Sequence, residues 1–520
     1  MNGLAAAIFD RRRGPLNRAL TIAALLLATA SPLQAQAPVP PLQPEIAAVV
    51  PTIEAHFRRY MAEQHVPGLA YGIVRDGRLV YSHGLGVREP GGDAADSETL
   101  FRIASMSKAF TALAILKLRD EGRLSLDALA ETYVPEMRGW RYPTSDSPRI
   151  RVRDLLSHAA GFVTDDPWGD RQQVMPEADF TRMLQAGVPF TRAPQTAHEY
   201  SNFGYALLGR IVTNVSGRPY KDYIEREIMR PLGMTSTGYD IAASPRARRA
   251  TGYRWENDAY VREPDMAHGT FGAMGGVQTS VSDYGRWIAF LLSAWPARDG
   301  PELGPVRRSS VRELATGLNF PQVTRRPGGG PDSCPQATTY GMGMRVAMDC
   351  ELGLTLAHGG GYPGYGSYVL LMPEHGIGVF AFANRTYAGP SPAVWAAALE
   401  LERAGWLVDR PLAVSASLEG AYSAARTMWR EGTLESGRAL LAMNFLMDRS
   451  ADNWAAEFAR LREDTGPCNT DSALTATGAL AGRFAWTCER GTLQGQLLLA
   501  PTGPPTIQAL RFNFAPLATP

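Results

Sequence analysis

Lysine is scarce in this sequence. Lysine and arginine together number 52 in the 520 residues, but only Lys108, Lys117 and Lys221 are lysine. Arginine stays protonated in proteins, whereas a lysine amine can lose its proton when it is buried. A position that keeps lysine in a chain this rich in arginine therefore suggests a need for a titratable amine.

The sequence also lacks any long block of like charge, and its formal net charge is only +1. Four arginines and one aspartate lie in the first 35 residues, and without them the formal net charge is −2. A nearly neutral chain has no electrostatic footprint for nucleic acid or an anionic membrane. We therefore expect a small-molecule or peptide substrate and no nucleic-acid partner, and the sequence leaves the oligomeric state open.

No apolar run in the sequence is long enough to span a bilayer comfortably. The best candidate, residues 19–30, follows an arginine cluster and precedes the small residues Ala35-Gln36-Ala37. This pattern predicts a signal peptide over residues 1–37, cut after Ala35 or Ala37, with an uncleaved anchor as the alternative. We therefore expect an exported protein, periplasmic or secreted, without a stable membrane span in the mature chain.

Cysteine is limited to four positions, which form two local pairs: Cys334 with Cys350, and Cys468 with Cys488. In an oxidising compartment this even number predicts two disulfides, each closing a loop of about 15 to 20 residues. Zinc binding is the rival interpretation, but the sequence has no C-x-x-C and no H-x-x-x-H among its eight histidines. We expect no metal and no cofactor.

Strand patterns occur near both ends of the first 400 residues, with helices between them. A helix is predicted over residues 45–64, and strands at 69–75 and 78–82 flank Asp76-Gly77, a dipeptide that tolerates the positive φ angles of a tight turn. Residues 126–335 have the pattern of loops and helices. Later strands are predicted at 341–348, 352–357, 367–372 and 376–383, and a helix follows them at 392–406. The pattern predicts an α/β domain, residues 38–408, with a sheet made from both chain ends and an inserted helical lobe.

A second, smaller unit is predicted after a linker at residues 409–417. In residues 418–520 a helical stretch is followed by strands in which Phe484, Trp486 and Cys488 alternate with polar residues. Helices followed by a small sheet form an α+β pattern, which distantly resembles the cone-shaped domains of the nuclear-transport-factor-2-like (NTF2-like) fold. No cluster of titratable residues stands out there, so we expect an accessory role.

Ser105 and Lys108 stand three residues apart at the start of a helix that is predicted to be buried. Residues 109–118 are apolar almost all round, which is typical of a core helix. Residues i and i+3 share a helix face, so the hydroxyl of Ser105 and the amine of Lys108 can meet in one pocket. Burial and the helix N-terminus favour a neutral amine that accepts a proton, and the Ser105 N–H is aimed at a developing oxyanion. An ordinary buried helix with a snorkelling lysine is the alternative.

Tyr200 and Asn202 form a Y-x-N motif between a loop and a helical segment. A phenol beside a cationic lysine can pass protons between a nucleophile and a leaving group. The Asn202 amide can bond both Lys108 and a substrate carbonyl. The motif is weak by itself, because a loop tyrosine is more often a packing residue, and its order and spacing relative to Ser105 give it weight.

His358 is followed by three glycines at the end of an apolar strand pattern. Glycine lets a substrate backbone approach a strand edge closely. Gly360 is therefore a candidate substrate-binding position, and the N–H of Gly361 is a candidate second oxyanion donor. A glycine-rich turn beside a core histidine is the alternative.

In their order and spacing these three motifs resemble the serine β-lactamase and D-alanyl-D-alanine carboxypeptidase family, in particular its class C branch with esterases and D-aminopeptidases. The likeness covers residues 50–405 and is densest at 66–68, 101–108, 155–161, 200–202, 231–234 and 366–384. The resemblance implies that Ser105 is the nucleophile, that Lys108 and Tyr200 handle protons, and that Asn202 positions the lysine and the substrate. It also implies a five-stranded antiparallel sheet, flanked by helices, beside a helical lobe.

One departure concerns the strand that carries Lys-Thr-Gly in β-lactamases, where this chain has His358-Gly359-Gly360. A histidine with the ordinary pKa near 6.5 is mostly neutral at pH 7, so it binds a substrate carboxylate more weakly than lysine does. It would gain charge as the pH falls towards 6. The resemblance is therefore closer to esterases and aminopeptidases than to true β-lactamases.

Together these patterns predict an exported serine hydrolase that cleaves an ester or amide bond through a Ser105 acyl-enzyme. A true β-lactamase or a D-alanyl-D-alanine carboxypeptidase is the alternative of the same class, and a non-catalytic sensor of penicillin or peptidoglycan is the alternative of another class. An α/β-hydrolase is disfavoured because the sequence has no G-x-S-x-G motif.

Overall fold

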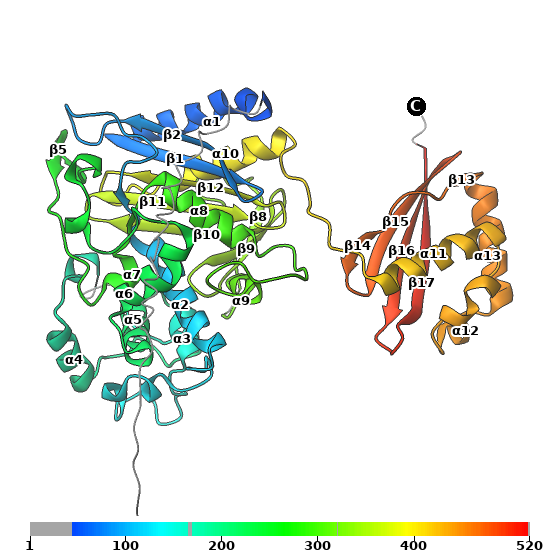
Figure 1. The fold of residues 1–520 in the computed structure, drawn as a ribbon, viewed down its shortest axis with the longest axis horizontal. Coiled ribbons are helices and arrows are strands. Elements are labelled where there is room, and N and C mark those ends of the chain that lie inside the picture. The colour runs from blue at the N-terminus through cyan, green and yellow to red at the C-terminus, as the bar shows by residue number, and fades with distance from the viewer. Residues whose placement is uncertain (1–43, 165–168, 320, 518–520) are drawn as a thin grey trace, which may run out of the picture. The chain divides into compact units, whose positions relative to one another are not determined.

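A computed structural model describes residues 44–164, 169–319 and 321–517 of the chain (Figure 1). The predicted signal peptide over residues 1–37 lies outside these residues. Within the described ranges, no helix combines the length and the apolar character that a membrane crossing requires.

The main sheet has eight antiparallel strands and is built from both ends of the first 400 residues. Its order is β2-β1-β12-β11-β10-β9-β8-β7. The N-terminal hairpin joins the later strands because β1 pairs with β12, with Leu69 opposite Ala383. The hairpin turns at Asp76 and Gly77, whose φ angles are 50° and 76°, as the dipeptide predicts. The strands are β1 (Gly68–Arg75), β2 (Arg78–Gly86), β7 (Gln322–Arg325), β8 (Pro335–Tyr340), β9 (Arg345–Asp349), β10 (Gly353–Tyr362), β11 (Tyr365–Met372) and β12 (Ile377–Ala383).

The prediction of a five-stranded sheet is wrong, because β7, β8 and β9 extend the sheet beyond β10. β9 overlaps the second half of the strand predicted at 341–348. β7 lies within the segment expected to hold loops and helices, and β8 begins at the end of that segment. Both strands are short, and the turn-forming run Pro327-Gly328-Gly329-Gly330 lies between them. The local sequence does not distinguish these strands from loops, and it is their pairing, with Val323 opposite Ala337, that makes them strands.

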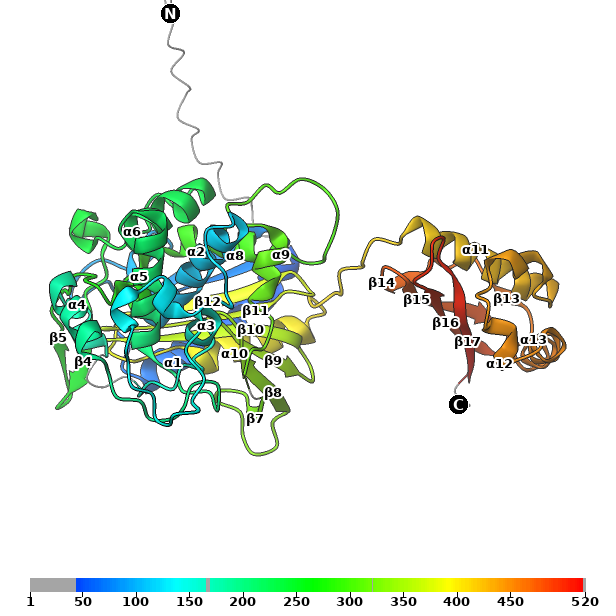
Figure 2. The same ribbon diagram turned by 90° about the horizontal axis from the view of Figure 1, so that it is seen from below.

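Two helices from the ends of this region cover one face of the sheet (Figures 1 and 2). They are α1 (Pro44–Glu63) and α10 (Ser391–Arg403), which pack against each other. Apolar side chains such as Phe57 and Trp395 fill the space between these helices and the sheet. The helix predicted at 45–64 is thus confirmed, as is the one that follows β12.

The other face of the sheet supports the inserted helices. Helix α8 (Val281–Leu292) packs on β1, β2 and β12, and α2 (Lys108–Asp120) packs on α5 (Asn202–Ser216). The described residues thus form the predicted mixed α/β fold. The remaining α-helices in the described residues before 400 are α3 (Val152–Leu156), α4 (Glu177–Ala186), α6 (Tyr220–Ile224), α7 (Gly272–Gly275) and α9 (Arg308–Glu313). Two short strand pairs accompany them, β3 (Phe101–Arg102) with β6 (Gln278–Thr279) and β4 (Tyr253–Glu256) with β5 (Ala259–Arg262).

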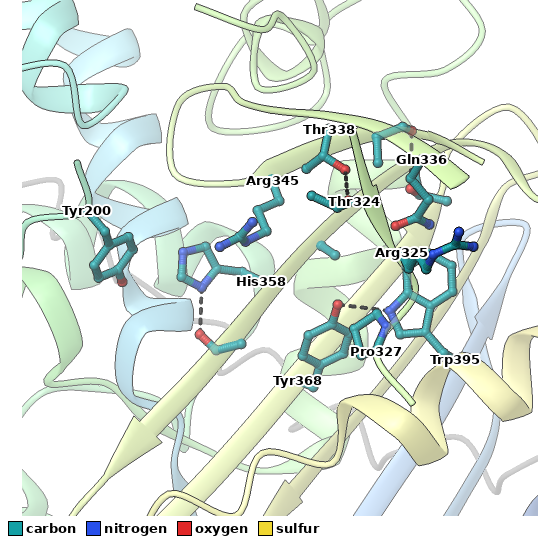
Figure 3. A pocket seen from close by; sticks show the side chains of 14 residues that line it. Tyr200, Thr324, Arg325, Pro327, Gln336, Thr338, Arg345, His358, Tyr368 and Trp395 are labelled. Carbon is teal, nitrogen blue, oxygen red and sulfur yellow. Dashed lines mark hydrogen bonds between the residues drawn. The ribbon is translucent and has the colours of Figure 1, made fainter. Parts of the chain in front are cut away.

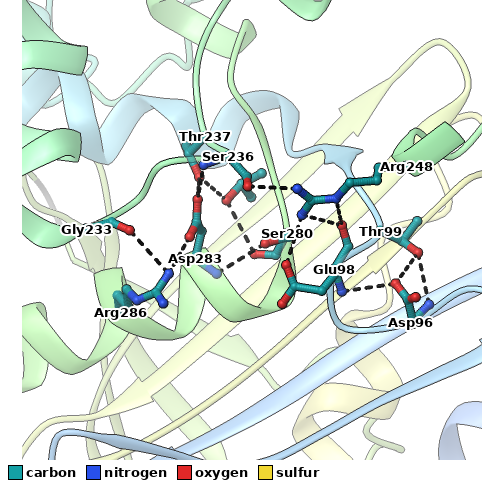
Figure 4. Close-up of polar contacts among 11 residues, drawn as sticks. Asp96, Glu98, Thr99, Gly233, Ser236, Thr237, Arg248, Ser280, Asp283 and Arg286 are labelled. Carbon is teal, nitrogen blue, oxygen red and sulfur yellow. Dashed lines mark hydrogen bonds and ion pairs between the residues drawn. The ribbon is translucent and has the colours of Figure 1, made fainter. Parts of the chain in front are cut away.

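A buried carboxylate, Asp283, fixes the start of α8 (Figure 4). Ser280 caps this helix, and its hydroxyl accepts a hydrogen bond from the Asp283 N–H at 3.2 Å. The Asp283 carboxylate accepts bonds from the Ser236 N–H at 2.8 Å and the Thr237 hydroxyl at 3.0 Å. Arg286 donates to its other oxygen at 2.6 Å. Asp283 therefore ties the helix to the loop that contains Ser236.

The C-terminal residues form an α+β unit with its own apolar core. Phe484, Trp486 and Cys488 are buried while the residues between them are exposed, so the predicted alternation is confirmed. The elements are α11 (Ala416–Glu431), α12 (Phe445–Asp448), α13 (Ala451–Thr465), β13 (Cys468–Asn469), β14 (Thr475–Gly478), β15 (Ala481–Cys488), β16 (Gly491–Ala500) and β17 (Thr506–Pro516). The boundary at 409–417 and the likeness to NTF2-like domains remain predictions.

Both predicted disulfides are present, Cys334–Cys350 and Cys468–Cys488. The first closes the open end of the β8–β9 hairpin, and the second joins β13 to β15, where the two cysteines pair directly. Cys334, Asp349 and Cys350 lie close enough together to share an ion, but the two sulfurs are bonded to each other.

Candidate active site

Ser105 lies on a tight turn directly before helix α2. Residues Ala104–Ser107 form one turn of 3-10 helix, and α2 begins at Lys108. Ala104 has a φ of 48°, in the left-handed region that residues with a Cβ rarely adopt. Such strain persists only where the surrounding structure holds it, and it is frequent at functional sites. The backbone thus presents Ser105 at the helix start, as the sequence predicts.

The Lys108 amine is buried and bonded to three oxygens. It donates to Ser105 Oγ at 3.1 Å, to Asn202 Oδ1 at 2.6 Å and to the main-chain oxygen of Met274 at 3.0 Å. Lys108 is 0% exposed because α2 is buried on nearly all sides. The structure therefore brings together three of the residues that the sequence assigned to one site.

Tyr200 lies against Lys108. The lysine Nζ is 4.9 Å from the centroid of the tyrosine ring, within the range of a cation–π contact. Asn202 is the first residue of α5, and Ser201 caps that helix by accepting a bond from the Gly204 N–H at 3.2 Å. The predicted change from loop to helix at this motif therefore brings both Tyr200 and Asn202 to the lysine.

His158 is a residue of this cluster to which the sequence assigned no role. Its ring packs on the Tyr200 ring with centroids 4.2 Å apart, and its Nδ1 accepts a hydrogen bond from the Ser201 N–H at 3.1 Å. Burial and the positive charge of Lys108 hold the pKa of His158 well below its ordinary value, so the ring is neutral and can accept this bond. His158 thus fixes the backbone between Tyr200 and Asn202.

His358 is buried on β10, and both of its ring nitrogens are bonded. Nδ1 donates to the Gly359 carbonyl oxygen at 2.6 Å, and Nε2 accepts from the Tyr340 hydroxyl at 2.9 Å. Burial, followed by the positive charge of Lys108, lowers the pKa of His358 to about 3. The ring is neutral at pH 7, as predicted. It is also neutral at pH 6, where the gain of charge expected from the ordinary pKa is wrong because that value takes no account of burial.

Gly360 lies where β10 passes close to the segment before Ser105, and Gly361 lies against Tyr387. A Cβ on Gly360 would stand 2.1 Å from Ser367 Oγ and 2.3 Å from the Ile103 carbonyl oxygen, so no larger residue fits. A Cβ on Gly361 would lie 2.7 Å from the Tyr387 ring. The glycines thus allow a close approach of the strand. Substrate binding at Gly360 and oxyanion binding at the Gly361 N–H remain predictions.

A pocket of about 480 Å³ opens beside these residues (Figure 3). Tyr200 and His358 line it at one end, and Tyr368 and Trp395 at the other. The volume lies within the range of small-molecule sites. A ligand-sized space therefore adjoins the cluster around Lys108.

Arg345 is a second residue of the site that the sequence did not single out. It lines the pocket, and its guanidinium points towards His358 in Figure 3. In the described part of the chain this guanidinium has neither a hydrogen-bond nor an ion-pair partner. Its charge contributes to the low pKa of His358. Only the pairing of β9 with β10, with Arg345 opposite Ala357, brings it to the site.

The family model described as Beta-lactamase matches residues 53–403, which is more than half of the chain. The chain therefore belongs to the beta-lactamase family. The matched segment contains every residue of the cluster described above.

This chain is similar to several curated proteins over only part of their length. Protein flp of Staphylococcus aureus (strain COL) is 28% identical over 323 residues, which is 62% of this chain and 60% of that protein. Unguisins hydrolase ungD' of Aspergillus campestris is 26% identical over 361 residues, 67% of this chain and 62% of that protein. The chain thus spans less than two thirds of the length of either relative.

Solved structures share the fold at low sequence identity. The octameric penicillin-binding protein homologue from Pyrococcus abyssi has a TM-score of 0.56 and 22% identity, covering 87% of this chain and 91% of its own. A class C beta-lactamase in complex with cefoxitin has a TM-score of 0.56 and 20% identity, covering 68% of this chain and 99% of its own. These likenesses support the mixed α/β fold class predicted from the sequence.

Proposed function

We propose that this chain is an exported serine hydrolase that cleaves an ester or amide bond through an acyl-enzyme on Ser105. The observation that carries the proposal is the hydrogen bond from the buried Lys108 amine to the Ser105 hydroxyl. Lysine can act as a proton acceptor where arginine cannot, and an adjacent base is what activates a serine nucleophile. The presence of lysine at position 108, in a sequence whose basic residues are nearly all arginine, supports this role.

In the proposed reaction, Ser105 Oγ attacks the substrate carbonyl carbon, and its proton passes to the pair formed by Lys108 and Tyr200. The N–H groups of Ser105 and Gly361 stabilise the oxyanion of the tetrahedral intermediate. The bond to the leaving alcohol or amine then breaks, and the leaving group takes the proton. Water attacks the acyl-enzyme by the same route and releases the carboxylic acid and free Ser105.

Asn202 has a positioning role in this scheme. Its side-chain oxygen holds the Lys108 amine at 2.6 Å, which fixes the amine beside Ser105. His158 acts one step further away, because its bond to the Ser201 N–H sets the backbone that carries both Tyr200 and Asn202.

Arg345 favours a second candidate, a true β-lactamase or a D-alanyl-D-alanine carboxypeptidase acting on a carboxylate-bearing substrate. The neutral His358 cannot attract a carboxylate by charge. Arg345, whose guanidinium has no ion-pair partner among the described residues, supplies a positive charge at the same end of the pocket. The likeness of the fold to a penicillin-binding protein homologue and to a class C beta-lactamase supports the same alternative.

Export and domain division belong to the proposal as well. The pattern of residues 1–37 supports a signal peptide, and two disulfides are compatible with an oxidising compartment such as the periplasm. The catalytic domain would comprise residues 38–408, followed by a linker at 409–417 and an accessory domain at 418–520.

Labelling with a fluorescent penicillin, together with a panel of p-nitrophenyl esters and D-amino-acid amides, tests the function. We expect turnover of at least one substrate class and a mass-shifted peptide that contains Ser105. Acylation without any turnover would instead indicate a non-catalytic sensor. A label on another serine would contradict the proposal.

A further inference from the structure

The pocket continues beyond the cluster around Lys108 because β9 leaves β10 early. β9 pairs with β10 only from Gly353 to Ala357, with Ala357 opposite Arg345 at the limit. β10 goes on pairing with β11 as far as Tyr362. Residues 358–362 thus keep one edge that β9 does not occupy, and two of them, His358 and Gly359, line the pocket (Figure 3).

The strand register places the far part of the pocket on a single face of the sheet. Directly paired residues of antiparallel strands share a face, and so do residues i and i+2. Ala347 pairs with both Thr338 and Thr355, and Gly359 pairs with Tyr368. The lining of this part, called the distal groove below, includes Thr324, Gln336, Thr338, Ala347, Thr355, Tyr368 and Trp395.

The distal groove lies on the face of the sheet that α10 covers. Tyr368 and Trp395 belong to the apolar cluster of α1 and α10. The residues between the groove positions, Val346 and Leu356, belong instead to the cluster that contains α2. A ligand that starts beside His358 would therefore pass the open edge of β10 and reach the opposite face of the sheet from Ser105.

The polar side chains of the distal groove are already paired within the protein, including Gln336, whose Nε2 donates to the Asp349 carboxylate at 2.8 Å. The hydroxyls of Thr324 and Thr338 bond to each other at 2.6 Å, and the Thr355 hydroxyl donates to the Ala347 carbonyl oxygen at 3.2 Å. The indole N–H of Trp395 donates to the Tyr368 hydroxyl at 3.0 Å. These groups need no ligand partner, so the groove offers mainly methyl groups and ring carbons to an occupant.

The charges near the groove stay at its borders. Among the described residues that line the pocket there is no aspartate or glutamate, and the two arginines are Arg325 and Arg345. Arg325 is exposed and donates to the Ser333 carbonyl oxygen, and Arg345 lies at the end next to His358. Burying an unpaired polar group costs free energy, so the interior favours an apolar occupant over a sugar.

We infer that the distal groove is a specificity subsite for an extended apolar group, aliphatic or aromatic, on one side of the scissile ester or amide bond. The inference rests on the proposed function of the Ser105 site. It also gives the three strands that extend the sheet a role in substrate binding, because β7, β8 and β9 contribute Thr324, Thr338 and Ala347 to the groove.

Two homologous series of esters test the inference. One lengthens the acyl chain of p-nitrophenyl esters from acetyl to octanoyl, and the other lengthens the alcohol of acetate esters from ethyl to octyl. We expect kcat/KM to rise at least about tenfold with chain length in one of the series, since burial of about two methylene groups is enough for that preference.

Neighbouring residues on β7 provide a variant and a matched control. Thr324 pairs with Gln336 and faces the groove, so the indole of Thr324→Trp should fill it and bring the ratio of kcat/KM for long and short esters close to one. Val323 is 84% exposed and alternates with Thr324, so it lies on the other face of the strand. Val323→Trp should therefore keep the ratio of the native protein.

The outcomes separate this inference from the proposed function. Hydrolysis of short esters with no chain-length preference in either series overturns the groove alone. An equal loss of preference in Thr324→Trp and Val323→Trp also overturns it. If no ester is hydrolysed, calorimetry with the Ser105→Ala protein decides. Binding of octanamide but not acetamide, abolished by Thr324→Trp, supports the groove without the proposed function, and absence of octanamide binding overturns the groove.

Discussion

The Lys108 amine donates a hydrogen bond to the Ser105 hydroxyl at 3.1 Å from a fully buried position. The other two lysines are different. Lys117 and Lys221 have side chains that are 21% and 32% exposed, and both form ion pairs with acidic neighbours. An arginine could replace either as a charge. The contrast supports the interpretation that Lys108 is retained for an amine that can exchange a proton.

Ser105→Ala should abolish hydrolysis and leave the fold intact. The change removes one hydroxyl from a turn whose backbone is held by neighbouring segments, so its cost in stability should be small. Activity assays and thermal unfolding of the two proteins measure both effects. A residual rate above about one thousandth of the native rate, in a pure preparation, would show that another group attacks the substrate.

Lys108→Arg should be nearly as damaging as Lys108→Ala. Arginine cannot give up its proton, and its larger head must enter a space bounded by Ser105, Asn202 and Met274. Lys117→Arg and Lys221→Arg are matched controls, because the same substitution there keeps a surface charge. Retained activity of Lys108→Arg at neutral pH would mean that this residue acts only as a fixed charge.

Much of the fold was predictable because its signals are local. The hairpin turn at Asp76-Gly77, the buried helix after Ser105 and the alternation around Trp486 each depend on a few neighbouring residues. β7 and β8 escaped prediction for the opposite reason. Both strands are short and flank a glycine-rich connection, and their strand character arises from pairing with each other and with β9 rather than from an alternation that the local sequence shows.

The site shows the same division. Ser105 and Lys108 could be placed together because a helical spacing joins them. His158 lies in the segment 155–161 of the family likeness, but its role depends on a hydrogen bond to Ser201, 43 residues away, which no local pattern predicts. Arg345 reaches the site through the pairing of β9 with β10, which its neighbours in the sequence do not mark either. The charge of His358 at pH 6 does not follow from the ordinary pKa of histidine, because its burial is a property of the folded chain.

The low pKa of His358 predicts a loss of stability in acid. The unfolded chain binds a proton at this ring near pH 6.5, and the folded chain does so only near pH 3. Between these values the unfolded state binds more protons, so the free energy of unfolding falls as the pH is lowered. At pH 5 the loss from this ring should be about 2 kcal/mol.

Urea unfolding of the native protein and of His358→Gln at pH 7 and pH 5 measures this loss. The glutamine does not titrate, so the variant should lose less stability between the two pH values than the native protein. His158 is present in both proteins, and its contribution cancels. Equal losses would contradict a low pKa for His358.

Removal of the Cys334–Cys350 disulfide should affect both stability and substrate binding. A loop of this length, 16 residues, corresponds to about 3 kcal/mol of unfolding free energy in the chain-entropy model. The bond also closes the β8–β9 hairpin, which lines the pocket through Thr338 and Ala347, so KM should rise. Serine at both positions, with thermal unfolding and kinetics, tests this.

The second disulfide is the matched control for that experiment. Serine at Cys468 and Cys488 removes a bond of similar loop length, 20 residues, from the C-terminal unit. This variant should lose stability and keep its KM. An unchanged KM in both double variants would show that the hairpin holds the pocket without its disulfide.

A chain that ends after Pro411 should still be acylated at Ser105. Arg410 belongs with the main sheet, since its N–H donates to the Glu374 carbonyl oxygen at 3.1 Å and its guanidinium bonds Asp76 at 2.6 Å. Leu412 instead forms a bridge with Ala476 and packs with the C-terminal core. A cut between Pro411 and Leu412 therefore removes the C-terminal unit and keeps these bonds to the sheet.

The rate of labelling by a fluorescent penicillin, compared between the truncated and the full chain, measures the effect of this cut. We expect similar rates, because every residue of the cluster around Lys108 precedes the cut. Cooperative thermal unfolding must first show that the truncated protein is folded, and Ser105→Ala in the truncated chain should give no label. A folded truncated protein that is not acylated would mean that residues 412–520 contribute to the reaction, against the accessory role predicted for them.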